Sequence, residues 1–189
     1  MVRRPAVRAS NAHDLFEFLK LSYPDAHRHL KETLPSHVLD RIEGTVRTDW
    51  IDIEHDAEYA NAVLRCLGPE ETKVMIRRFF VQSLVRTPMM YSLFKGVQLV
   101  FGVSVGAFLR VVPSGFQQAY RDAFEMRLDR GDHEALLTLD DLAPEVLRTP
   151  YPIFWEGAFL GLYDLASAEP RLDYRFSRAT RRIEAHFRW

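Results

Sequence analysis

The chain has 189 residues, of which 47% are hydrophobic, 27% are charged and 12% are aromatic. This composition excludes a disordered chain and fits one globular domain with a core rich in aromatic rings. The formal net charge is -1, so no overall field attracts nucleic acid, and we expect no nucleic-acid partner. The single cysteine, Cys66, excludes an intramolecular disulfide and favours a cytoplasmic location.

Helices are predicted for most of the first 120 residues. Asn11 is expected to cap the first helix, which ends before Pro24. Gly68-Pro69 is expected to end one helix and begin the next. Residues around Trp50 fit a bend, a short strand or a helix start. Further helices are predicted at 25–33, 36–44, 54–67, 69–85 (with a break at 86–88), 89–101 and from 105 to 112 or somewhat beyond.

No membrane span is expected. The longest apolar stretch, at 97–109, is shorter than the roughly 20 residues that a membrane-spanning helix needs. We interpret it as part of the buried core.

After Tyr120 the hydrophobic period changes to every second residue, which indicates β-strands. A helix with large aromatic side chains, predicted at 150–167, lies between two alternating hairpins. Its small residues Gly157 and Gly161 allow close approach to a neighbouring element. The sequence therefore predicts a single α+β domain (1–189), in which a helical, bundle-like layer (11–120) precedes a hairpin-helix-hairpin, four-stranded antiparallel sheet (121–189).

One motif matches that of a catalytic serine. Residues 102–106 read G-x-S-x-G around Ser104, and Asp164 and His186 follow in the order of a hydrolase triad. That motif works where a strand delivers the serine into a tight turn, whereas helices are predicted upstream. We therefore interpret residues 102–106 as a junction between two helices that glycine makes flexible. A serine hydrolase that uses Ser104 is a distant alternative.

No metal site is predicted. Of His27, His29 and His37, only His29 has a helical spacing to Asp25 that suits two ligands of one ion. The acidic run at 49–58 lacks the glycine and the spacing of a calcium loop, so we interpret it as solvated.

Two groups of residues are candidates for ligand binding. Large rings beside small residues can leave a pocket for a small apolar ligand between the 150–167 helix and the helical layer, although the same rings can simply fill the core. Arginines on the outer face of the predicted sheet could bind an anionic ligand, although arginine there is also ordinary solubility chemistry. The candidate residues are Phe154, Trp155, Phe159, Tyr163, Arg175 and Arg182.

Several stretches resemble known families. They are Trp50-Ile51-Asp52-Ile53-Glu54, Leu67-Gly68-Pro69, residues 101–113, and residues 183–189 with their closing Arg-Trp. From about residue 23 onward, the chain resembles an uncharacterised paralogous family of myxobacteria.

The predicted layout also looks like that of haem-NO-binding and vinyl-4-reductase-like sensing domains. The haem branch uses a Tyr-x-Ser-x-Arg strand and a histidine on a preceding helix. Here the comparable strand reads Phe124 to Asp129, and no histidine lies between His55 and His133. We therefore leave the cofactor unknown and do not expect haem.

Together these features predict a non-catalytic small-ligand-sensing or adaptor domain of a signalling protein, whose small apolar or anionic ligand is unidentified. The alternative is a homo-oligomer such as a homodimer, or a module that binds a protein partner through a sheet edge or an exposed apolar helix.

Overall fold

The computed structural model describes residues 4–86 and 88–189, and helices come first and the larger sheet last, as predicted. The expected break at 86–88 includes Thr87, which lies outside the described residues. The helices are α1 (Ala9–Ser22), α2 (Pro24–Thr33), α3 (Ser36–Gly44), α4 (Ile53–Arg86), α5 (Pro88–Phe101), α6 (Val105–Leu109), α7 (Val112–Ala119) and α8 (Tyr151–Leu165). The strands are β1 (Ala6–Arg8), β2 (Trp50–Asp52), β3 (Tyr120–Arg121), β4 (Glu125–Arg130), β5 (Glu134–Asp140), β6 (Leu172–Ser177) and β7 (Arg182–Arg188).

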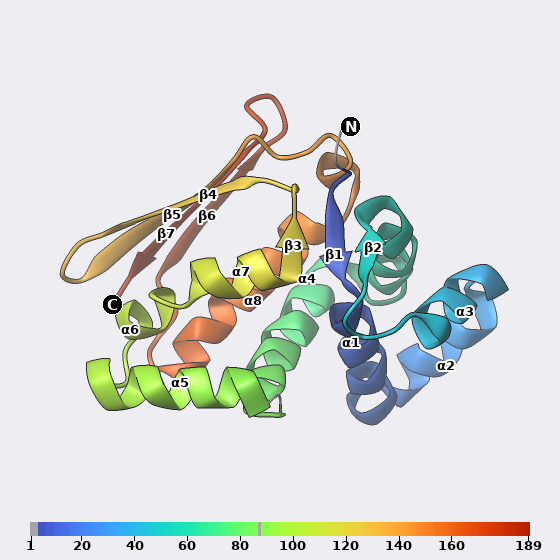
Figure 1. Ribbon diagram of the computed structural model, residues 1–189, viewed down its shortest axis with the longest axis horizontal. Helices are drawn as coiled ribbons and strands as arrows, with labels where there is room; N and C mark the ends of the chain where they lie inside the picture. Colours follow the sequence, from blue (N-terminus) through green and yellow to red (C-terminus); the bar gives the residue numbers. More distant parts are fainter. Residues whose placement is uncertain (1–3, 87) are drawn as a thin grey trace.

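The larger sheet is four-stranded and antiparallel, in the order β4-β5-β7-β6. It lies at one end of the molecule, α1 to α3 lie at the other, and α4 and α8 run between them (Figure 1). Leu137 pairs with Ala185 and Leu139 with Ile183, so one face of the sheet is apolar and buried. The predicted hairpin-helix-hairpin arrangement is confirmed.

Glycines bring α8 close to α4. A Cβ atom at Gly157 would lie 2.7 Å from the Lys73 carbonyl oxygen, and one at Gly161 would lie 2.8 Å from the Phe80 ring. A residue larger than glycine would collide with α4 at these distances. The face of α8 that carries the two glycines therefore packs on α4. The aromatic face of α8 therefore turns toward the sheet and α7.

The Gly68-Pro69 break is confirmed as a kink within α4. Gly68 has φ 76° and ψ 167°, a left-handed conformation that glycine adopts without strain. Pro69 then starts the second segment, because its ring suits the first turn of a helix.

The first helix begins two residues before the predicted cap at Asn11. The Ala9 N–H donates to the Asp49 carbonyl at 2.9 Å, and the Ser10 N–H donates to the Arg47 carbonyl at 3.0 Å. The loop before β2 thus satisfies helix donors that a capping side chain would otherwise have to satisfy. Asn11 lies inside the helix.

A second, smaller sheet has the order β2-β1-β3. Val7 at its centre pairs with Ile51 on one side and with Tyr120 on the other. The ambiguous segment at Trp50 is therefore a strand. This sheet ties the start of the chain to the junction between the helical layer and the larger sheet.

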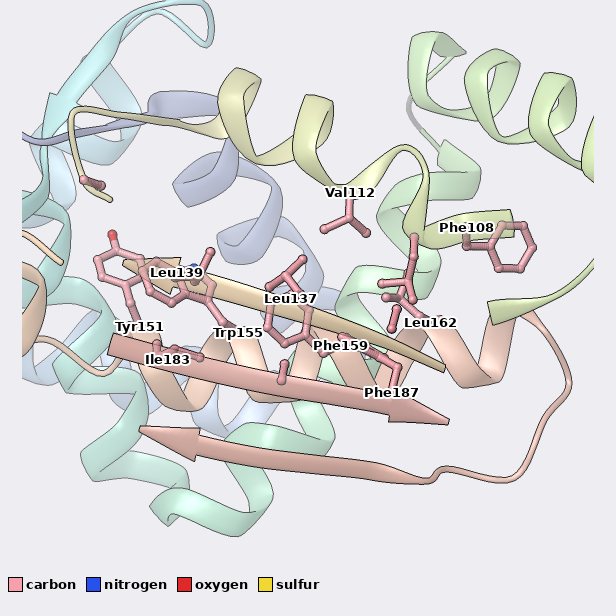
Figure 2. Packing of buried hydrophobic residues seen from close by; sticks show 14 of the residues in the cluster. Phe108, Val112, Leu137, Leu139, Tyr151, Trp155, Phe159, Leu162, Ile183 and Phe187 are labelled. Atoms are coloured by element: carbon pink, nitrogen blue, oxygen red, sulfur yellow. The ribbon is translucent and has the colours of Figure 1, made fainter. Parts of the chain in front are cut away.

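Two hydrophobic clusters meet at α8. One joins the inner sheet face to α6, α7 and α8, and the other joins α1 to α4. Tyr151 and Trp155 belong to the first cluster, shown in Figure 2, and Phe154 belongs to the second. Within the described residues, no helix is long and apolar enough to cross a membrane. The expected division at residue 120 stays a prediction.

Candidate functional site

A cavity of about 680 Å³ lies where the two clusters meet. It is lined by residues of β1, α1, the loop before β2, α4, α6, α7, β3 and α8, so both halves of the chain build it. The exposed lining residues Arg47, Thr48 and Gln118 mark its mouth. Pockets for small molecules and cofactors usually have volumes of roughly 300–1,000 Å³, so a ligand of that class fits here.

Aromatic rings form much of the cavity wall. Tyr151, Phe154 and Trp155 lie on one face of α8, because helical residues three and four apart are neighbours. The Trp155 ring centroid lies 5.4 Å from that of Tyr120 and 6.1 Å from that of Phe116. In Figure 2, Tyr151 and Trp155 lie between the larger sheet and α7. Such walls suit a flat apolar ligand.

One end of the cavity is polar, and we call it the Asp56 end; it comprises Asp56, Tyr59, Tyr120, Tyr151 and Trp155. The Tyr151 hydroxyl donates a hydrogen bond to the Asp56 carboxylate. Asp56 is only 9% exposed, and burial raises the pKa of its carboxyl to about 6. Burial also raises the pKa of the Tyr151 and Tyr59 hydroxyls well above the usual tyrosine value, so both stay protonated at neutral pH.

Two donors at the Asp56 end have no hydrogen-bond partner. Tyr59 is 1% exposed and its hydroxyl is unpaired, and the Trp155 indole N–H is unpaired too, although it lies near the Tyr120 hydroxyl. Leaving a buried polar group unpaired costs about 1–3 kcal/mol. Because both residues line the cavity, a ligand with polar atoms could satisfy these groups.

The mouth carries two arginines. The Arg8 guanidinium lies 3.9 Å from the centroid of the Trp50 ring and donates to the carbonyls of Thr48 and Gln118. Arg47 pairs with Asp14. The Arg8 guanidinium has no carboxylate within salt-bridge distance among the described residues, so its positive charge remains available to an anionic group at the mouth.

The cavity gathers two of the four aromatic residues that the sequence singled out. Phe154 and Trp155 line it, whereas Phe159 and Tyr163 lie further along α8 in the core under the sheet. The Phe159 ring packs 5.6 Å from that of Phe187. The Tyr163 hydroxyl donates to the Arg171 carbonyl and accepts from the Arg188 N–H.

The two candidate arginines lie away from the cavity, on the outer face of the sheet. Arg175 pairs with Asp173 at 2.8 Å, and Arg182 pairs with Asp140 at 2.6 Å. Both arginines are exposed, and each is neutralised by its neighbour. An anionic ligand on this face stays a prediction.

Sequence reasoning missed the polar residues of the cavity. Asp56 was grouped with the solvated acidic run, yet it is buried. The signal was its spacing, because Asp56 lies three residues before Tyr59 and four before Ala60, on the buried stripe of α4. Tyr59 lies on the same buried stripe, and no pattern in the sequence indicates that its hydroxyl lacks a partner.

Ser104 caps a helix. Its side chain accepts a hydrogen bond from the Ala107 N–H at 3.1 Å at the start of α6, after a left-handed Gly102. Asp164 pairs with Arg77 across α4 and α8, and His186 contacts Glu134 on the outer sheet face. The structure thus gives each of these three residues a structural partner of its own.

In the part of the chain that the structure describes, no group of three metal-ligating side chains could hold a metal ion. His29 and His37 line a second pocket, of about 650 Å³, beside α4, where His37 contacts Glu58 at 3.0 Å.

Neither the family models nor the curated proteins include a match to this chain. Solved structures do match it. One, described as "Modulating Heme Redox Potential Through Protein-Induced Porphyrin Distortion", aligns over 96% of this chain and 99% of its own, with TM-score 0.61 and 14% identity. A mutant T. Tengcongensis H-NOX aligns over 96% of both chains, with TM-score 0.61 and 12% identity. The Fe(II) unliganded H-NOX protein from K. algicida aligns over 94% of this chain and 95% of its own, with TM-score 0.52 and 8% identity.

The fold is therefore that of the H-NOX domains, as the resemblance in layout predicted. At these identities the comparison establishes the fold alone. It also corrects one expectation. Our expectation against haem is wrong, because descriptions of structures that share this fold over nearly the whole chain name haem. That expectation relied on one strand motif and one missing histidine, which are local features, whereas the cavity is built by the fold as a whole.

The cavity lining fits a flat, mostly apolar group such as haem. Haem iron is held in proteins by histidine, cysteine, methionine or tyrosine side chains. Among the described lining residues only tyrosines are of these types, namely Tyr59, Tyr120 and Tyr151. Arg8 and Arg47 at the mouth are of the type that pairs with carboxylates.

Proposed function

We propose that the chain is a small-ligand-sensing domain whose central cavity binds haem. The observation that carries this proposal is the aromatic-walled cavity of about 680 Å³ at the junction of the two clusters. The descriptions of structures with the same fold support haem as the first group to test. When bound, haem supplies an iron whose open coordination position can take a small gas molecule.

The residues of this chain would hold such a group by contact and by charge. Trp155 and Phe116 provide apolar walls for a flat group, and the tyrosines of the Asp56 end, which stay protonated, provide hydroxyls that can donate hydrogen bonds to it. Arg8 at the mouth provides a cation for a carboxylate. Because Trp155 lies in the wall, a ligand in the cavity should change the tryptophan fluorescence of the chain.

The test is a titration of the purified full chain with haemin, followed by visible absorption and by tryptophan fluorescence. We expect a saturable absorption change at one haem per chain, with quenching of fluorescence. The variant Ala158→Phe, which places a ring in the cavity, should weaken binding by about tenfold or more. The control Ala26→Phe makes the same change on α2, away from the cavity, and should bind as the wild type does. Equal binding by both variants would contradict a site in this cavity.

Self-association is the second candidate function, and one observation favours it. Large apolar side chains are exposed near the end of α5, where Leu99 is 86% exposed and Val100 is 71% exposed, with Phe101 and Val103 beside them. An exposed apolar patch of this kind is typical of an interaction surface. We expect light scattering to show a concentration-dependent dimer that Val100→Glu abolishes; a strict monomer at high concentration would exclude this role.

A further inference from the structure

The Asp56 carboxylate is an unusual group to find in a cavity of aromatic walls. It accepts a hydrogen bond from Tyr151, which leaves most of its acceptor capacity unused. No lysine, arginine or histidine of the described residues pairs with it within salt-bridge distance. Arg41 attracts it through space, but the Arg41 guanidinium pairs with Glu58 at 3.9 Å and donates to the His55 carbonyl.

A second, independent observation points to a ligand at the same place. The Tyr59 hydroxyl, on the same face of α4 and almost completely buried, has no partner. It lies close enough to Asp56 for the carboxylate to raise the pKa of the hydroxyl. A buried carboxylate without a cation and a buried hydroxyl without a partner therefore line one end of one cavity.

The surrounding rings add to this chemistry. The Tyr120, Tyr151 and Trp155 rings lie within 5.4–5.9 Å of one another, and two of the three pairs are edge to face. Aromatic faces attract organic cations, and this attraction strengthens where water is excluded. A carboxylate among aromatic rings is thus complementary to a protonated amine: the ring faces and the carboxylate attract its charge, and its N–H groups donate to the carboxylate oxygens.

We propose that the Asp56 end is a binding site for the ammonium group of a small amine with an apolar, aromatic-sized body. The body lies against Trp155 and Phe154, and the ammonium N–H groups donate to the Asp56 carboxylate and the Tyr59 hydroxyl oxygen. This goes beyond the proposed haem site, because it needs no iron and is tested on haem-free protein.

The test compares two probes of nearly equal shape, 2-phenylethylamine and 2-phenylethanol, by calorimetry and by intrinsic tryptophan fluorescence on the full chain. Hydrogen bonds to charged groups contribute about 1.5–3 kcal/mol, so the amine should bind about 10- to 100-fold more tightly than the alcohol. Asp56→Asn should remove that preference, and Asp40→Asn, an exposed change on α3, should retain it. Tyr59→Phe should weaken the amine more than the alcohol.

Unfolding curves for every variant show that each one is folded, so that a lost preference reports the site itself. Equal affinity of the two probes, no binding of either, or an amine preference that survives Asp56→Asn would each overturn the proposal. These results can be distinguished from those of the haem titration. Haemin binding without a preference for the amine would contradict the amine site only, and amine binding without haemin binding would contradict the haem site only.

Discussion

Replacing Asp56 by Asn should stabilise the ligand-free protein at neutral pH. The carboxyl is 9% exposed and has no cation within salt-bridge distance in the described part of the chain, so its ionisation in the folded state is costly. Asparagine keeps an oxygen that can accept the Tyr151 hydrogen bond, and it carries no charge. Residues at binding sites commonly reduce stability in this way.

The magnitude follows from the pKa of the Asp56 carboxyl. Burial raises this pKa from the ordinary 3.8 to about 6. As the pH rises, the carboxyl loses its proton at a lower pH in the unfolded chain than in the folded protein. Native stability is therefore highest below pH 3.8, and the free energy of unfolding falls as the pH rises through about 6. At 1.36 kcal/mol per tenfold change in the ionisation equilibrium, the loss reaches about 3 kcal/mol at neutral pH.

Urea unfolding of the wild type, Asp56→Asn and the exposed control Asp40→Asn measures this effect. The free energy of unfolding of Asp56→Asn should exceed that of the wild type by about 3 kcal/mol near neutral pH, and this excess should shrink toward zero near pH 4. The control should show no such pH-dependent excess. An Asp56→Asn variant that is less stable than the wild type at neutral pH, or whose difference from it does not change with pH, would refute a costly buried carboxylate.

Three further changes test the packing. Tyr59→Phe removes an unpaired buried hydroxyl and should raise the free energy of unfolding by about 1 kcal/mol, as denaturant curves would show; a loss of stability would mean that the hydroxyl has a partner. Gly157→Ala places a Cβ 2.7 Å from the Lys73 carbonyl and should lower the melting temperature at a cost of about 1–3 kcal/mol, whereas the exposed Gly44→Ala should not. Ser104→Ala removes a cap at α6 and should cost about 1 kcal/mol with no change in esterase activity; a specific loss of hydrolysis would revive the hydrolase alternative.

Much of the fold was predictable because its signals are local. The Gly68-Pro69 stop, the alternation in 124–139 and 173–189, and the spacing of the small residues of α8 can each be recognised within a single element, although the α8 glycines act by letting α4 approach. The smaller sheet was not predictable. Its strands are two or three residues long and carry no periodic pattern, and Val7 reaches Tyr120 only through the tertiary fold.

The site was less predictable than the fold, because its lining comes from elements spread over most of the chain. Phe154 and Trp155 were found from helix composition. Asp56 was hidden in an acidic run, since composition does not distinguish a buried carboxylate from its solvated neighbours. The outcome for haem has the same cause: a local motif was weighed, whereas the cavity depends on how α4, α7 and α8 pack together.

Native mass spectrometry of the full chain after incubation with haemin tests the central claim most directly, because it counts bound ligand per chain. A cavity that binds haem predicts one haem on the wild type and on Ala26→Phe, and strongly reduced occupancy on Ala158→Phe. No retained haem on the wild type, or equal occupancy of all three proteins, would contradict a ligand site at the junction of the two clusters.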